Sequence, residues 1–446
     1  MPATETFPAL DLTSIRAQFP SLAQTVNGHP AAFFDGPGGT QVPQCVIDAI
    51  SDYLRRHNSN TGGAYATSRR TDAMIAEARA AMADFLHCAA DEVVFGLNMT
   101  QLTYAISRAI GRDLQPGDEI LVTRLDHDAN VSPWLQMAED RKVTVRWAEI
   151  HDEDCTLDMR DLASKINERT KLVAVGYASN AVGTINPVKE IIQLAHQAGA
   201  LAYIDAVHYT PHGLIDVAAL DCDFLVCSTY KFFGPHMGVL FGKRQHLARL
   251  RPYKVRPLTE AVPFRWEYGT LNHECIAGIT ACVDYIAGLG TSTANHETQM
   301  KMNRLPHPSA PFAEGGKSNH KTPRRAAIEA AYERIHEHER TLLELAMSGL
   351  QKIPGAKIYG ITDPTRFHQR CGTIALRIEG YTPLELATKL GDRGIFTWDG
   401  NYYALNLTEH LDVEKTGGFL RIGLVHYNTL EEVDRLLAAL REIVGA

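Results

Sequence analysis

Short, uninterrupted runs of apolar residues recur along the chain, and each run ends abruptly in polar or turn-forming residues. Runs of this kind are typical of buried parallel strands, because helices cover both faces of such a sheet. The clearest unit is 171–206, where two such strands flank a helix that begins at Pro187 and ends at Gly199. The pattern predicts an α/β fold with a mostly parallel sheet flanked by helices.

Segments with helical periodicity alternate with these strands over most of the chain. Polar or glycine-bearing stretches predict loops at 57–68 and 398–417. The helices expected outside the 171–206 unit are 11–20, 43–56, 71–86, 101–111, one from about 130, 161–168, 273–290, 326–350, 382–394 and 429–443.

The 446 residues are more than one simple core holds, so a large domain and a smaller one are expected. Between 291 and 325 the composition shifts to serine, threonine, histidine, lysine, proline and glycine, which is typical of a mobile surface insertion. We expect a large domain at 29–290 and a smaller α+β domain built from 1–28 and 326–446.

Charge and cysteine content narrow the class of protein. Acidic and basic residues are interspersed and the net charge is −8, which favours neither nucleic acid nor an anionic membrane as a partner. No apolar run approaches the roughly 18 residues that cross a bilayer, and the first residues lack a signal-peptide pattern. The eight cysteines form no CxxC pair, so we expect reduced thiols in a cytoplasmic protein.

Two predicted strands end in residues that suit a cofactor site. The run LAYI ends at Asp205, and the run DFLVC leads into Ser228, Thr229, Tyr230 and Lys231. In open α/β sheets the ligand site lies beyond the carboxyl ends of the strands, so Asp205 and Lys231 are expected side by side. An amine that can form a Schiff base, beside a carboxylate that can hold a ring nitrogen protonated, suits pyridoxal 5′-phosphate (PLP). Taken singly, the aspartate can also cap a turn and the lysine can be a solvated charge.

Polar strand ends upstream supply further parts of such a site. A strand leads into Asn98 and Thr100 at the start of a helix, which is a favourable place for a phosphate. His127 follows the next strand and could stack on a flat ring, and Asn180 follows the strand beside that of Asp205. The alternatives are an ordinary helix cap for Asn98 or Thr100 and a buried or capping histidine for His127.

Taken together, the motifs DHDAN, SNAVGT, IDAVH, CSTYK followed by GP, YGT and RIGLVHYNT resemble those of the class V aminotransferase group of PLP enzymes, which have fold type I. Within that group the chain is most similar to the cysteine desulfurases. The likeness runs over nearly the whole chain. It implies a large PLP-binding domain and a smaller C-terminal α+β domain.

The resemblance implies a role for each matching residue. Lys231 would carry PLP as a Schiff base, Asp205 would pair with the ring nitrogen, and His127 would stack on the ring. His208 stands where the family has a glutamine that faces the ring hydroxyl, with Asn180 nearby. The positions that match phosphate-binding residues are Met99, Thr100, Ser228 and Tyr230, of which Tyr230 replaces a histidine.

Two further matches concern the substrate and the subunit arrangement. Arg421 matches the arginine that binds the α-carboxylate of the substrate, a planar bidentate task that suits a guanidinium, and Asn180 borders the same cleft. Thr270 matches a residue that reaches the phosphate of the neighbouring subunit. The resemblance therefore implies a homodimer with a shared active site.

The sequence departs from the cysteine desulfurases in one loop. Their sulfur-carrying cysteine aligns with Tyr403 in FTWDGNYYALNL, and Trp398 stands at the place of a nearby arginine. No cysteine lies between 372 and 446. Cys371 is the nearest thiol, and its place before a strand favours a core residue.

The sequence thus predicts a PLP enzyme that acts on a small α-amino acid, with sulfur-containing ones among the candidates. Elimination chemistry by a C–S lyase fits best, because losing the loop cysteine leaves that chemistry intact. An aminotransferase or an amino-acid epimerase needs the same cofactor residues. A scaffold protein without turnover is the alternative of another class, and the retention of Lys231, Asp205 and Arg421 argues against it.

Overall fold

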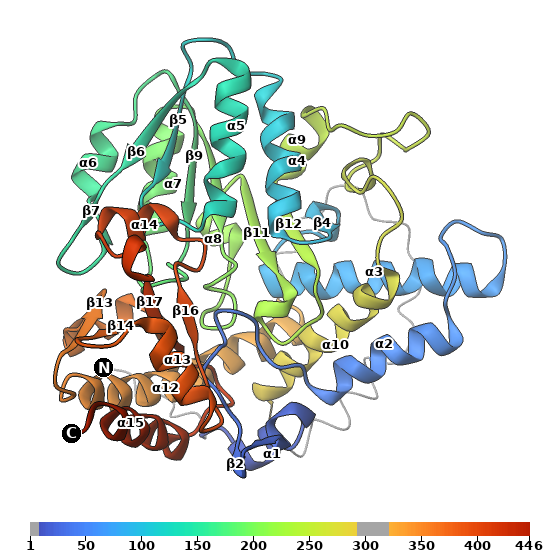
Figure 1. Cartoon of the computed structure of the whole chain (residues 1–446). Helices are drawn as coiled ribbons and strands as arrows, with labels where there is room; N and C mark the ends of the chain where they lie inside the picture. Colours follow the sequence, from blue (N-terminus) through green and yellow to red (C-terminus); the bar gives the residue numbers. More distant parts are fainter. Residues whose placement is uncertain (1–8, 292–320) are drawn as a thin grey trace, which may run out of the picture.

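A seven-stranded sheet forms the centre of the larger part of the molecule (Figure 1). The computed structural model describes residues 9–291 and 321–446. All neighbouring pairs run parallel from β11 to β6, as the apolar runs predict, whereas β12 runs antiparallel to both of its neighbours. The strands, in spatial order, are β4 (Val93–Gly96), β12 (Gly238–Gly242), β11 (Phe224–Ser228), β10 (Leu201–Asp205), β9 (Thr170–Gly176), β5 (Glu119–Thr123) and β6 (Thr144–Ala148).

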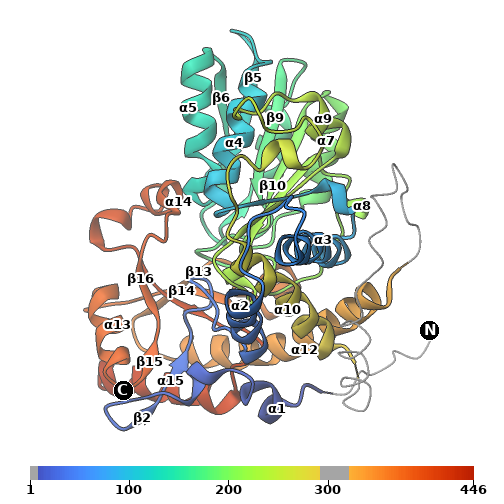
Figure 2. The ribbon, with the colours of Figure 1, turned by 90° about the vertical axis from the view of Figure 1, so that its right-hand side faces the viewer.

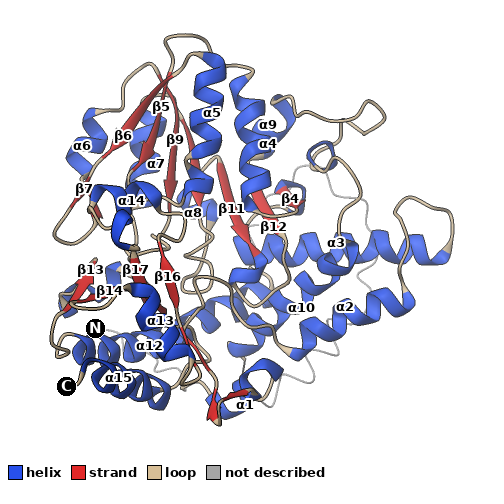
Figure 3. Cartoon of the chain, in the orientation of Figure 1, coloured by secondary structure: helices blue, strands red, loops and turns tan. Residues whose placement is uncertain are grey.

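Helices cover both faces of this sheet (Figure 3), which is why its strands are apolar on both sides. In β11, Phe224 and Val226 pack into one core and Leu225 and Cys227 into the other, as the two-residue period of a strand requires. The first core includes α4 (Met99–Gly111), α5 (Ser132–Arg141) and α9 (Arg244–Arg249), and the second includes α3 (Ala66–Leu86), α7 (Val188–Gln197) and α10 (His273–Leu289). The remaining helices of this part are α2 (Gln44–Arg56), α6 (Met159–Ser164) and α8 (Val217–Leu220).

A second, smaller sheet has its own core and lies below the first in Figures 1 and 2. Its antiparallel strands are β13 (Ala356–Tyr359), β14 (Thr373–Ile378), β17 (Phe419–Gly423) and β16 (Trp398–Gly400). They pack with α13 (Pro383–Gly391), α15 (Leu430–Val444) and the second half of α12 (Pro323–Leu350). These two sheets match the expected large parallel sheet and smaller C-terminal α+β unit.

Two elements join the two cores. In α12, Ile328 and Ile335 belong to the core of the large sheet, whereas Leu342 belongs to that of the small one. Near the N-terminus, β3 (Ala32–Phe33) pairs in parallel with β15 (Ile395–Phe396). The domain division at 29–290, 1–28 and 326–446 stays a prediction. β3 lies close to its predicted boundary between residues 28 and 29.

The structure corrects several predicted boundaries. The helix expected at 11–20 is only α1 (Leu12–Arg16), and a turn and a separate 3-10 helix at Pro20–Ala23 follow it. The helix expected from 71 begins at Ala66, so part of the predicted 57–68 loop is helical. The predicted 398–417 loop contains β16 and α14 (Leu405–His410).

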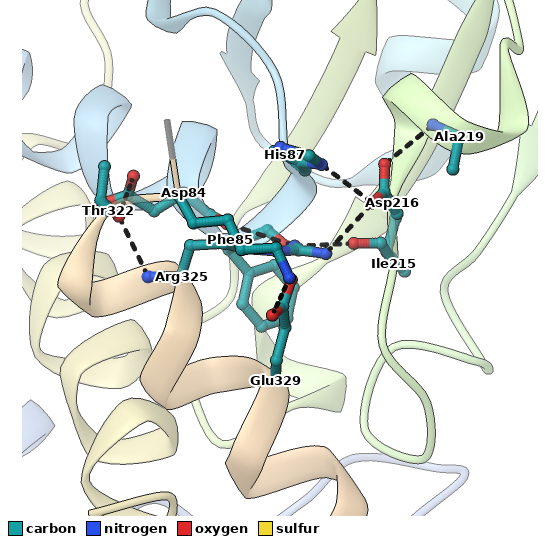
Figure 4. A network of polar contacts seen from close by, with 10 residues as sticks. Asp84, Phe85, His87, Ile215, Asp216, Ala219, Thr322, Arg325 and Glu329 are labelled. Carbon is teal, nitrogen blue, oxygen red and sulfur yellow. Dashed lines mark hydrogen bonds and ion pairs between the residues drawn. The ribbon is translucent and has the colours of Figure 1, made fainter. Parts of the chain in front are cut away.

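The expected insertion at 291–325 lies mostly outside the described residues, but its last residues belong to the packed fold. Thr322 caps α12, and its hydroxyl donates to Asp84 over 2.8 Å. Arg325 is buried and donates to the carbonyl groups of Phe85 and Ile215, each at 2.9 Å (Figure 4). The predicted C-terminal end of the insertion is therefore wrong. Threonine followed directly by proline is a helix start, and this signal outweighs the polar composition.

Each of the eight cysteines is free. Among the described residues, no helix combines the length and the apolar character that crossing a membrane requires.

Candidate active site

A cavity of about 410 Å³ lies beyond the carboxyl ends of β9, β10 and β11, where an open α/β sheet places its ligand. Thr270 is the one predicted site residue that does not line it. The predicted residues that do are Met99, Thr100, His127, Asn180, Asp205, His208, Ser228, Tyr230, Lys231 and Arg421.

Lys231 follows β11 in a single 3-10 turn and faces the glycine-rich loop 35–40. Its Nζ donates to the carbonyl of Pro37 and, over 3.0 Å, to that of Gly38. Burial lowers the pKa of Lys231 to about 7, and the charge of Arg421 acts in the same direction against the opposing effect of Asp205. A large share of the amine is therefore neutral at physiological pH, which is the nucleophilic form.

Asp205 ends β10 as a buried carboxylate. Its Oδ1 accepts a hydrogen bond from the backbone N–H of Val207 over 2.9 Å, and its second oxygen has no such partner within the described part of the chain. Burial raises the pKa of Asp205 to about 6, against the lowering effects of Val207 and Lys231. Asp205 is thus ionised at neutral pH and has an oxygen available for a protonated ring nitrogen.

Two further carboxyl groups have raised pKa values, and the sequence interpretation gave neither a role: buried Asp126 lines the cavity, and half-buried Asp35 lies beside it in the 35–40 loop. Asp126 accepts a hydrogen bond from Thr123 over 2.6 Å, and burial raises its pKa to about 7, helped by the nearby charge of Asp205. Burial raises the pKa of Asp35 to about 6, against the lowering effects of Arg421 and Lys231. Only the position of Asp126 in the DHDAN motif could have drawn attention to it.

The start of α4 forms the end of the cavity that suits an anion. Asn98 caps this thirteen-residue helix, and both Asn98 and the first helical residues, Met99 and Thr100, line the cavity. The Met99 backbone N–H donates to the hydroxyl of Ser228 over 3.1 Å, which leaves the hydroxyl proton of Ser228 free to point elsewhere. Helix N-terminal N–H groups and hydroxyl groups are suitable ligands for a phosphate.

Few positively charged side chains line the cavity, so few can neutralise a phosphate. Burial lowers the pKa of His127 to about 4 and that of His208 well below its usual value, so both rings are neutral at pH 7. Among the lining residues that the structure describes, the cations are Lys231 and Arg421.

Arg421 lies on β17, and its contacts orient the guanidinium so that it can bind a planar anion. Its Nη1 donates to the Asn180 carbonyl over 2.9 Å, and its guanidinium lies 4.0 Å from the centre of the Tyr402 ring. Nε is buried without a hydrogen-bond partner, and Arg421 makes no ion pair with any described residue. Burial lowers the pKa of Arg421 to about 10, so it stays charged at neutral pH. A substrate carboxylate would satisfy this cation.

The segment 398–403, here named the aromatic loop, forms one wall of the cavity. The Asn180 side chain donates to the Tyr402 carbonyl over 2.8 Å, and the Asp128 N–H donates to the Tyr403 carbonyl over 2.7 Å. Tyr402 and Tyr403 both have positive φ, at 56° and 59°. This backbone is unfavourable for tyrosine, so these contacts hold the loop against strain.

The Tyr403 ring stacks on His127, with 5.4 Å between ring centres and 25° between planes. Tyr403 is otherwise open to solvent, with 73% of its surface exposed. The expected stacking of His127 on a cofactor must therefore use the other face of the imidazole or follow movement of Tyr403. It stays a prediction.

Three predicted residues need separate comment. The Nε2 of His208 lies 3.0 Å from the hydroxyl of Thr373, and the expected contact of His208 with a ring hydroxyl stays a prediction. Thr270 is exposed outside the cavity of its own chain. Cys371 is buried, and it borders a different cavity.

Comparison with known proteins places the chain in a family. The model of the family "Aminotransferase class-V" matches residues 32–307 and 325–436. The chain belongs to the class-V aminotransferase family. This finding agrees with the expected fold type and identifies the chain as a member of a PLP-dependent enzyme family.

Relatives within this family cover almost the whole chain. A cysteine desulfurase of Dickeya dadantii is 32% identical over 445 residues, with 96% of both chains covered. A probable cysteine desulfurase of Halalkalibacterium halodurans is 30% identical over 443 residues, with 96% of this chain and 97% of the other covered.

Solved structures agree in fold. The apo cysteine desulfurase of Thermococcus onnurineus superimposes with a TM-score of 0.81 at 23% identity, over 99% of both chains. A cysteine desulfurase of Escherichia coli in its S-sulfonic acid form gives 0.78 at 24% identity, over 98% of this chain and 99% of the other.

The residues of the cavity fit the cofactor of the family. Lys231 is a half-buried amine with a lowered pKa, and Asp205 is a buried carboxylate with one oxygen that has no hydrogen-bond partner among the described residues. The capped start of α4 offers a phosphate site at the other end. Arg421 supplies a cation without a carboxylate partner in the described part of the chain.

Proposed function

We propose that the protein is a PLP-dependent lyase that breaks the C–S bond of a small α-amino acid by β-elimination. The observation that carries this proposal is that Lys231, Asp205 and Arg421 lie in one cavity, where Arg421 has no ion-pair partner among the described residues and the aromatic loop contains no thiol. The relatives named cysteine desulfurases support a sulfur-containing amino acid as the substrate.

Different residues of the cavity would contact different parts of the cofactor. Lys231 would attach its aldehyde carbon, Asp205 would hold a proton on its ring nitrogen, and His127 and His208 would border its ring. The phosphate would lie at the group formed by Met99, Thr100, Ser228 and Tyr230. When bound, PLP supplies an electron sink for the bond that breaks at the substrate Cα.

The remaining steps follow from this chain's own side chains. Arg421 would bind the α-carboxylate in a bidentate manner and orient the substrate. The Lys231 Nζ, with its pKa near 7, would take the proton from Cα and is matched to that task near neutral pH. The sulfur leaves from Cβ, and hydrolysis of the remaining fragment gives a keto acid and ammonia.

The aromatic loop determines how the sulfur leaves. A persulfide needs a thiolate of accessible pKa, whereas this loop presents Trp398, Tyr402 and Tyr403 to the cavity. A tyrosine hydroxyl, with a pKa of about 10, does not take the place of that thiolate. Sulfide or a thiol should therefore be released directly. The same aromatic side chains favour a substrate larger than cysteine.

The test is to incubate the PLP-loaded protein with cysteine and with a series of thioether amino acids. We expect keto acid, ammonia and free thiol or sulfide in equal amounts, with no persulfide on the protein by mass spectrometry. The thioethers should be better substrates than cysteine, and Tyr403→Ala should reduce this preference without adding a persulfide.

Two results would contradict this assignment. Alanine formed in step with a persulfide on Cys371 would show desulfurase chemistry through that thiol. Transfer of the amino group to a keto acid, with the side chain intact, would show an aminotransferase.

We also infer that the active site is completed by a second copy of the chain. The Gln101 side chain, on the first turn of α4, donates to the Tyr268 hydroxyl over 3.1 Å, so the segment that carries Thr270 lies beside the phosphate end of the cavity but outside it. Leu97 and Tyr268 are exposed apolar residues in the same region, at 53% and 37%. A second copy of the chain bound at this surface would cover Leu97 and Tyr268. It would also bring its own Thr270 to a phosphate site that has few cations.

Subunit mixing tests this arrangement. Lys231→Ala and Thr270→Arg are each expected to lower activity, and their co-expression should restore part of it, because one site of a mixed dimer receives intact residues from both chains. Sizing should show a dimer. A fully active monomer, or no recovery when mixed dimers are isolated, would show that each chain has a complete site.

A further inference from the structure

A second cavity, of about 620 Å³, lies next to the catalytic one, and a cluster of buried side chains lies between the two. His208 lines the catalytic cavity, whereas His212 and Cys371 line the second. One ligand atom from each of these residues lies within 4.8 Å of the other two, and each residue is at least 95% buried. His212 and Cys371 have no part in the reaction proposed above.

Each imidazole in this cluster has one nitrogen held by an oxygen atom. The Nδ1 of His212 lies 2.7 Å from the Glu339 carboxylate, and the Nε2 of His208 lies 3.0 Å from the Thr373 hydroxyl. The opposite nitrogens, Nε2 of His212 and Nδ1 of His208, form no hydrogen bond with any described residue. Histidines that bind metals are typically arranged in this way, because the outer oxygen fixes the tautomer and directs the free lone pair at the ion.

One buried carboxylate brings negative charge to the cluster, on the side away from the Arg421 and Lys231 charges that also reach His208. Glu339 is a buried carboxylate on α12, and its Oε1 has no hydrogen-bond partner in the described part of the chain. Arg370 is nearby, but it directs its guanidinium at the backbone carbonyl groups of Val182, Ile361 and Thr373. It forms no ion pair with Glu339. A bound divalent ion would supply the missing positive charge.

We propose that His208, His212 and Cys371 bind one zinc ion, with Glu339 holding His212 in the metal-binding tautomer. Two imidazole nitrogens and a thiolate are ligands that zinc prefers, and water from the second cavity would complete a tetrahedral site. With bonds of about 2.0–2.3 Å, ligand atoms on one zinc lie roughly 3.3–3.8 Å apart. Small side-chain rotations therefore close the cluster around the ion, and the second cavity provides its entry path.

The ion would join the two sheets of the molecule. His208 and His212 follow β10 of the large sheet, whereas Cys371 precedes β14 of the small sheet. Because Thr373 contacts Nε2 of His208, zinc on Nδ1 would occupy its other nitrogen. Only the carbon atoms of the His208 ring could then contact the cofactor. Metal binding should therefore stabilise the folded chain, as any ligand specific to the folded state does, and should change the absorbance of bound PLP.

The experiment counts metal in the full-length, PLP-loaded protein after dialysis against zinc and then against buffer. We expect about one zinc per chain by elemental analysis, and cobalt in its place should give the intense visible absorption of a tetrahedral site. Cys371→Ser and His212→Asn should each lose the metal. Glu339→Gln should weaken its affinity by about 10–100-fold, and Cys45→Ser, a control thiol against α10, should keep it.

Zinc that washes out of the wild-type protein, or that Cys371→Ser retains, would overturn the proposal. If His212→Asn does not fold, Cys371→Ser decides alone, because serine has nearly the shape of cysteine. The metal count needs no turnover, so it stays informative even if the lyase assignment fails.

Discussion

Replacing Lys231 by alanine is expected to lower kcat by roughly 10²–10⁴-fold, the range that a positioned acid–base group contributes. The variant should fold normally, because the amine donates to the carbonyl groups of Pro37 and Gly38 and lies over the Tyr230 ring, but forms no ion pair with a described residue. Borohydride reduction of the wild-type protein with PLP, followed by peptide mapping, should find the pyridoxyl group on Lys231. An adduct on Lys243, or full activity in the alanine variant, would refute the assignment. Lys352→Ala, an exposed lysine control, should change neither result.

The pH dependence of cofactor uptake gives an independent measure of the same residue. Attack on the aldehyde needs the neutral amine, so the uptake rate of the cofactor-free protein should rise as the pH increases through about 7 and then level off. An unperturbed lysine, with a pKa of about 10.4, would keep the rate rising far above that pH. The charge of Arg421 lowers the pKa of Lys231, so Arg421→Gln should move the rise to higher pH.

The second large effect is expected for Asp205→Asn. An amide cannot hold a proton on the ring nitrogen as a carboxylate does, and a hydrogen bond to a charged group contributes about 1.5–3 kcal/mol. We therefore expect kcat to fall by about 10- to 150-fold or more. PLP should stay attached, because Lys231 is intact.

Three measurements separate this effect from misfolding. The melting temperature of the Asp205→Asn protein should stay near that of the wild type, its PLP content should be unchanged, and the pH dependence of its PLP spectrum should shift. Asp140→Asn, an exposed control on α5, should have wild-type activity. Undiminished turnover in a PLP-loaded Asp205→Asn protein would remove this residue from the mechanism.

The sequence by itself determined the parallel sheet and the polar residues at the carboxyl edge of its strands that line the cavity. An apolar run that ends abruptly in a polar residue must place that residue at the carboxyl edge of its strand, and parallel strands share this edge. Asp205, Lys231, His127 and Asn180 were therefore predicted together from local pattern alone. Arg421 and Thr270 needed family motifs, because no local signal assigns them to the site.

Only the tertiary structure decided which distant segments meet these strand ends. The carbonyl of Pro37 reaches Lys231 across 194 positions of sequence, and that of Asn180 reaches Arg421 across 241. Cys371 looked like an isolated core thiol until folding brought His212 and Glu339 to the same cavity wall. Local periodicity describes how one element is buried, whereas contacts of this kind depend on how separate cores pack together, which no single stretch of sequence specifies.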